Sequence, residues 1–110
     1  MEQTWVRAAV LEVPQIYLTE WSAFICGWSN EAKPFSTHLV GHRAATGKSR
    51  ASSAVLIYDP LSRRAVTASG KVYELVGPAN PQSDAIYMRS EWFSVNGGRY
   101  VRDATNDFAV

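Results

Sequence analysis

Residues 51–76, ASSAVLIYDPLSRRAVTASGKVYELV, contain three strand-like runs, at 51–58, 64–68 and 71–76. The runs are rich in β-branched and aromatic residues, which favour strands. Asp59 and Pro60 predict a turn after the first run, because proline fixes its own φ and aspartate can bond the backbone beyond it. Ser69-Gly70 fits a two-residue hairpin loop after the second run. The stretch therefore predicts a three-stranded antiparallel meander.

Strand-like composition recurs on both sides of this meander, and the loop at 29–34 carries turn residues. The first of these runs ends at Pro14, which cannot donate to a ladder, although part of it, residues 7–12, could instead form a helical turn. The further runs predicted as strands are 4–13, 21–28, 36–43 and 99–104.

One helix is predicted over 81–95. Asn80 can cap its first amides and Pro81 is tolerated at its first position. Apolar residues then recur at spacings of three and four, which places them on one stripe of the helix. We expect this stripe to be buried against Val55, Ile57, Val72 or their opposite-face neighbours. The stripe consists of Ala85, Met88, Trp92 and Val95.

These elements predict an α+β fold in one domain, 1–110: a strongly curved antiparallel sheet of about six strands with the helix packed on one face. Hydrophobic residues make up 46% and charged residues 19% of the chain. This balance excludes a disordered protein. No apolar run reaches the roughly 20 residues that a membrane span needs. The polar start of the sequence lacks a secretory signal, so we expect a cytoplasmic protein.

Positive charge is concentrated in the middle of the chain, although the formal net charge is only +1. Residues 40–71 hold six basic side chains and one acidic residue, Asp59. Such a segment can bind an anion or a nucleic-acid backbone, or it can be a solvated hairpin that keeps the domain soluble. The candidate anion or nucleic-acid ligands are Arg43, Lys48, Arg50, Arg63, Arg64 and Lys71.

The same segment contains VGHRAATGKSR, residues 40–50, which superficially resembles a phosphate-binding loop. A Walker A loop needs four residues between its first glycine and the Gly-Lys pair, but five separate Gly41 from Gly47. It must also open a helix, whereas residues 51–58 are strand-like. We therefore expect a loop between two strands and no NTPase activity.

Few residues indicate chemistry directly. His38 and His42 are four apart, which in a strand separates them by about 13 Å, too far for one metal ion. Both are interpreted as strand residues, although His42 could act as a base if it met Glu20, Asp59 or Asp103 in space. His42 and Asp103 are the candidate pocket residues. No G-x-S-x-G elbow supports acyl transfer.

The remaining candidates are hydrophobic. Cys26 has no second thiol for a disulfide or a zinc site, and its apolar neighbours indicate buried packing in preference to a nucleophile. Trp21 and Trp28 are interpreted as core, or as the rim of an interface. No catalytic residue, metal or cofactor is predicted.

Three segments, GHRAATGKSR (41–50), VTASGKVYELVG (66–77) and WFSVNGGRYVRDAT (92–105), are similar to small bacterial proteins of the kind carried on mobile gene cassettes. That resemblance implies a single-domain cytoplasmic bacterial protein and transfers no site residue. The leading hypothesis is a non-enzymatic binding or protein-interaction module that forms a homodimer. It rests on thirteen aromatic residues in a short chain that carries no recognisable catalytic signature. The alternatives are an anion or nucleic-acid binder using the basic segment, and a small enzyme or ligand-binding fold with a cavity between sheet and helix.

Overall fold

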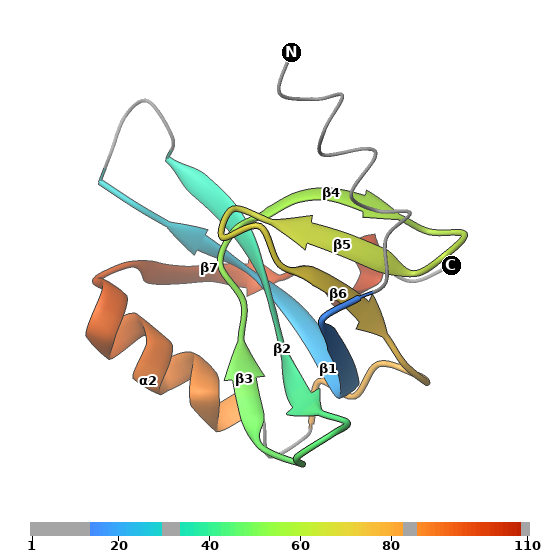
Figure 1. Cartoon of the computed structure of the whole chain (residues 1–110). Coiled ribbons are helices and arrows are strands. Elements are labelled where there is room, and N and C mark those ends of the chain that lie inside the picture. The colour runs from blue at the N-terminus through green and yellow to red at the C-terminus, as the bar shows by residue number, and fades with distance from the viewer. Residues whose placement is uncertain (1–13, 30–33, 83–85, 109–110) are drawn as a thin grey trace.

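The computed structural model describes residues 14–29, 34–82 and 86–108, and its elements are shown in Figure 1. No helix among these residues is both long enough and apolar enough to cross a membrane. The described residues form seven strands, one α-helix and a short 3-10 helix. In chain order they are β1 (Ile16–Gly27), β2 (Phe35–Arg43), β3 (Ser49–Ala51), β4 (Val55–Asp59), β5 (Arg64–Thr67), β6 (Val72–Leu75), α2 (Ile86–Asn96), β7 (Arg99–Asp103) and η1 (Thr105–Asp107).

The strands form one open mixed sheet in the order β3-β2-β1-β6-β5-β4, with β7 also paired to β1. The α+β class is therefore confirmed. The prediction of a wholly antiparallel sheet is wrong at one pair, because β1 and β6 run parallel. The meander itself is antiparallel, as predicted. Its last strand returns beside the start of β1 in the same direction, a long-range pairing that no local turn dictates.

β1 is the strand that joins the two halves of the sheet. Its first residues, starting at Ile16, pair with β6, and its last residues, ending at Gly27, pair with β7. Between them the register with β2 shifts after Thr19, and Glu20 adopts a positive φ of 50°. The predicted strand 21–28 thus covers only the second part of β1. The strand predicted at 4–13 lies outside the described residues.

The predicted strand 51–58 is in fact divided between β3 and β4. β3 pairs with β2, whereas β4 pairs with β5. The break contains Ser52, whose buried hydroxyl accepts from Leu39 N at 2.9 Å and donates to Ser53 O at 2.7 Å. Such side chain to backbone bonds compete with a strand ladder, so the two serines interrupt it.

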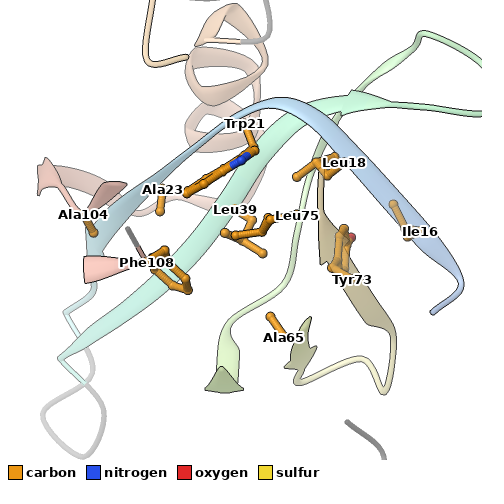
Figure 2. Packing of buried hydrophobic residues seen from close by; sticks show 10 residues of the cluster. All are labelled: Ile16, Leu18, Trp21, Ala23, Leu39, Ala65, Tyr73, Leu75, Ala104 and Phe108. Atoms are coloured by element: carbon orange, nitrogen blue, oxygen red, sulfur yellow. The ribbon is translucent and has the colours of Figure 1, made fainter. Parts of the chain in front are cut away.

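The larger core cluster lies between β1 and β2 on one side and β5 and β6 on the other. Figure 2 shows its side chains pointing toward one another from these strands and from the C-terminal segment. Trp21 is 1% exposed, and its Nε1 donates to Gly77 O at 3.1 Å. The cluster consists of Ile16, Leu18, Trp21, Ala23, Leu39, Ala65, Tyr73, Leu75, Ala104 and Phe108.

A second cluster joins α2 to the sheet. Buried Phe24, Cys26 and Val40 pack with Met88, Trp92 and Phe93, among other side chains, and α2 contacts β2 and β3. Met88 and Trp92 are therefore on the packed side of the helix, as predicted.

The other half of the helix prediction is wrong. Val95 is 83% exposed, whereas Phe93, which the predicted stripe does not include, packs against the second cluster. Val55, Ile57 and Val72 belong to other clusters. The helix packs on the cluster of Phe24, Cys26 and Val40 and not on these three residues. Asn80 Oδ1 accepts from Gln82 N at 3.1 Å, and Pro81 and Gln82 form a turn, so the expected helix start at Pro81 is too early. The first described residue of α2 is Ile86. Ala85 lies outside the described residues.

Candidate functional site

An open pocket of about 630 Å³ lies among β2, the segment that joins β3 to β4, β4 itself and α2. None of its lining residues carries a formal charge when histidine is neutral. Its apolar lining consists of Trp28, Phe35, Ala54, Val55, Leu56 and Trp92. Its polar lining consists of Ser36, His38, Ser53 and Asn96.

Strand geometry brings two of these polar residues together. Ser36 and His38 are two apart in β2, so their side chains leave the same face of the strand. Val40 continues this face into the cluster under α2, whereas Leu39 points into the larger core. The alternation of β2 therefore places a hydroxyl and an imidazole side by side below the helix.

A chain of hydrogen bonds runs through the two side chains. Trp28 Nε1 donates to Ser36 Oγ at 2.7 Å. Ser36 Oγ and His38 Nε2 are also 2.7 Å apart. His38 Nδ1 lies 2.9 Å from the backbone oxygen of Ser52.

The proton positions follow from the last of these contacts. A carbonyl oxygen can only accept, so His38 Nδ1 must carry the hydrogen. In a neutral ring Nε2 is then the acceptor, and the Ser36 hydroxyl donates to it. Trp28 supplies the hydrogen bond that the Ser36 oxygen accepts. The backbone of Ser52 therefore orients the hydroxyl hydrogen of Ser36 toward the imidazole.

The His38 ring is kept neutral by its surroundings. It is 2% exposed and stacks on Phe24 with centroids 5.4 Å apart, while Trp92 lies 4.4 Å away on centroids. Burial lowers the pKa of His38 below its ordinary value of 6.5, and backbone bonds to Ser52 and Ser53 oppose this in part. At neutral pH the ring therefore offers a lone pair to Ser36.

The other polar groups of the pocket keep hydrogen-bonding capacity for a ligand. Asn96 Nδ2 donates to Trp92 O at 2.9 Å, but an amide group has a second hydrogen and a carbonyl oxygen. The Ser53 hydroxyl oxygen accepts from Ser69 N at 3.0 Å and retains its own hydrogen. No group of three or more His, Cys, Asp or Glu suited to a metal occurs in the described part of the chain.

Three of the six basic candidates make specific contacts within the chain. Arg50 Nε donates to Tyr73 Oη at 2.8 Å, and its guanidinium lies 5.9 Å from that ring. Arg63 Nη2 donates to Gly77 O at 2.8 Å. Arg64 forms an ion pair with Glu74 at 3.1 Å.

The other three basic candidates lie at turns. Arg43 and Lys48 flank the β2–β3 hairpin, where Arg43 N bonds Lys48 O at 2.9 Å. Gly47 and Lys48 thus precede a strand and not a helix, as predicted. Lys71 is exposed between β5 and β6. None of the six basic side chains lines the pocket.

The predicted pocket residues His42 and Asp103 are held elsewhere. His42 pairs with Thr19 in the sheet, and its Nδ1 lies 3.1 Å from Gly47 O. Asp103 pairs with Phe24 and accepts from Thr105 N at 2.8 Å. Neither lines the pocket described above.

The aromatic and thiol candidates divide between core and pocket. Trp21 is buried in the larger core, whereas Trp28 forms part of the pocket wall. Cys26 is fully buried, and burial raises the pKa of its thiol, so the interpretation as a packing residue is confirmed.

Sequence reasoning missed the Ser36–His38 pair. The Ser-x-His spacing in a predicted strand already placed both on one face, but only the tertiary structure shows that Ser52 and Trp28 complete the chain of bonds.

Comparison of the chain and its structure with known family models, curated proteins and solved structures gives no significant match.

Proposed function

We propose that this protein binds a small, uncharged and largely apolar molecule in the pocket between β2, β4 and α2. The observation that carries the proposal is the open pocket of about 630 Å³, in which aromatic side chains and a few polar groups line the same space. Binding sites for small molecules commonly have this size and this combination of surfaces.

The charge of the lining supports an uncharged ligand. A charged group that leaves water for an apolar pocket loses its hydration and needs a partner of opposite charge. The lining supplies none, because its polar members are hydroxyl, amide and neutral imidazole groups. A hydroxyl, carbonyl or amide on the ligand could instead bond Asn96 or Ser53.

The aromatic walls support a planar or hydrocarbon-rich ligand. Trp28 and Trp92 lie edge to face, with centroids 5.6 Å apart. Trp28 is further held by its bond to Ser36, so the wall is ordered before a ligand arrives. A preordered site loses less conformational entropy on binding.

Two finer features of the predicted fold belong to this proposal: strong curvature of the sheet and packing of α2 on one face. The register shift after Thr19 supports the curvature, because bulges bend strands. The contacts of α2 with β2 and β3 support its placement on one face. Both features would help to enclose the pocket.

The proposal is tested with N-phenyl-1-naphthylamine, an uncharged probe whose fluorescence increases in apolar surroundings. We expect saturable binding to the wild-type protein. Leu56→Arg places a charge at the pocket wall and should weaken binding at least about tenfold, or about 1.4 kcal/mol. Leu61→Arg is the matched control, because Leu61 is 95% exposed and lies outside the pocket lining. Absence of saturable binding, or equal affinity of the two variants, would contradict the proposal.

A second candidate function, self-association, is favoured by exposed apolar side chains at the junction of α2 and β7. Val95 is 83%, Tyr100 44% and Val101 37% exposed. Every residue of β7 is exposed, which is unusual for a strand of a sheet. A second copy of the chain that covered these side chains would remove apolar surface from water. We therefore keep the homodimer as a proposal.

A further inference from the structure

We infer that Ser36 is a nucleophile and His38 its general base, and that the pocket hydrolyses small uncharged carboxylic esters. The inference rests on the proposed function, since the ester must enter the same pocket. It goes further because it assigns a reaction to the polar end of that pocket.

The distance between nucleophile and base meets the geometric requirement. Ser36 Oγ lies 2.7 Å from His38 Nε2, within hydrogen-bond reach for proton transfer. The tautomer is the productive one, because the Ser52 carbonyl holds the ring hydrogen on Nδ1. A backbone carbonyl here has the orienting role that a carboxylate has in the Ser-His-Asp triad.

Trp28 completes the arrangement around the Ser36 oxygen. A hydroxyl oxygen has one hydrogen and two lone pairs. The hydrogen is directed to His38, and one lone pair accepts from Trp28 Nε1. The second lone pair is left for attack on a carbon atom. Trp28 is thus a positioning residue as well as a wall of the pocket.

Ser36 and His38 differ in how far they are exposed to solvent. Ser36 is half-buried at the pocket, whereas His38 is 2% exposed beneath it. A substrate can therefore reach the hydroxyl, whereas the imidazole is reached through the pocket that it helps to line. The Trp92 ring, whose centroid lies 4.4 Å from that of His38, would also stabilise the imidazolium that forms during the reaction.

In the first step Ser36 Oγ bonds to the ester carbonyl carbon and its proton moves to His38 Nε2. The electron pair of the carbonyl shifts to oxygen and returns as the bond to the alcohol oxygen breaks. The alcohol leaves with the proton from His38. In the second step water attacks the acyl group, His38 takes a proton from that water, and Ser36 departs and regains the proton. The sum is ester plus water to carboxylic acid plus alcohol.

The first experiment measures hydrolysis of p-nitrophenyl butyrate. We expect the wild-type protein to release many equivalents of p-nitrophenol, and Ser36→Ala to react at the rate of buffer alone. Ser62→Ala is the matched control and should retain the wild-type rate. Ser62 Oγ donates to Asp59 Oδ2, also at 2.7 Å, but Ser62 does not line the pocket. A wild-type rate equal to buffer, or an unchanged rate in Ser36→Ala, overturns the inference.

The second experiment locates the nucleophile with diisopropyl fluorophosphate, which bonds phosphorus to a reactive serine oxygen and releases fluoride. Peptide mass mapping should place one diisopropylphosphoryl group on Ser36 and none on Ser62. Label on another residue, or no label, overturns the assignment. A protein that binds N-phenyl-1-naphthylamine without labelling or hydrolysis disproves this inference and leaves the proposed function intact.

The role of His38 is tested without replacing a buried residue. The groups around its ring are Phe24 from β1, the backbone of Ser52 and Ser53, Ser36 from β2 and Trp92 from α2, none of which titrates in the acidic range. The labelling rate of the wild-type protein should therefore decrease as the pH is lowered. The pH profile should fit a single ionisation with a pKa below the ordinary value for histidine. A rate that does not change with pH overturns the assignment of His38 as base.

Discussion

The ring centroids of His38 and Trp92 lie 4.4 Å apart, so a residue of α2 directly covers the histidine of β2. Trp92 also meets Phe24 and Trp28 edge to face. The packing of the helix and the polar end of the pocket are therefore one structural unit. A change in the helix should alter both the stability of the fold and the ionisation of His38.

Trp92→Ala should lower the free energy of unfolding by about 3 kcal/mol. This is the lower end of the range for emptying a large aromatic position, because Trp92 is only partly buried. Val95→Ala is the matched control on the same helix and should change stability by less than about 0.5 kcal/mol, since Val95 is exposed. Urea unfolding measures both variants. Equal midpoints for the two variants would show that α2 does not pack through Trp92.

The ionisation of His38 should make stability depend on pH in the mildly acidic range. Its pKa is lowered in the folded state by burial, so between that pKa and 6.5 the unfolded chain binds more protons. The contribution of His38 to the free energy of unfolding should therefore be constant above about pH 6.5. It should decrease as the pH falls below that value, and level off below the lowered pKa.

NMR titration of the His38 ring measures the pKa directly, and urea unfolding at several pH values measures its consequence. In Trp92→Ala the ring is opened to water, so its pKa should move back toward the ordinary value. A His38 pKa at or above 6.5 in the wild-type protein would contradict the burial that the structure shows.

Local signals predicted the meander and most strand positions, because turn residues such as Pro60 and Gly70 act within a few positions of themselves. They could not predict the parallel pairing of β1 with β6, which depends on how distant segments meet. They also placed Val95 inside, because the apolar spacing continues to it, but Val95 lies in the last turn of α2, one residue before the helix ends, and is 83% exposed.

The site was harder to predict than the fold, for a related reason. The glycine-rich hairpin and His42 stand out in the sequence by their residue types and spacing, whereas Ser36 and His38 belong to no known motif. Their chemistry depends on Ser52 and Trp28, which lie outside β2 and reach it only through the fold. A Ser-x-His sequence in a strand indicates that the two side chains lie close together on one face. Only their other partners, Trp28 and Ser52, show that Ser36 donates the hydrogen bond and His38 accepts it.

Self-association should depend on the exposed end of α2. Val95→Lys puts a charge on the surface proposed for the dimer and should shift the molar mass from dimer toward monomer in light scattering at matched concentration. Leu61→Lys is the control, because Leu61 is equally apolar and 95% exposed in the β4–β5 turn. A wild-type monomer at high concentration, or the same shift in both variants, would contradict a dimer through this surface.

Gly98 lies so close to Cys26 that the two positions should be energetically coupled. A Cβ at residue 98 would collide with Cys26 Sγ and would come within 3.2 Å of the Trp28 ring. Gly98→Ala should therefore destabilise the protein by about 1–3 kcal/mol, as expected for overpacking a filled interior. Cys26→Ala removes the sulfur and should make room for the added methyl group. In urea unfolding the double variant should be more stable than the sum of the two single effects predicts, by about 0.5–3 kcal/mol. Strict additivity would mean that Gly98 does not pack on Cys26.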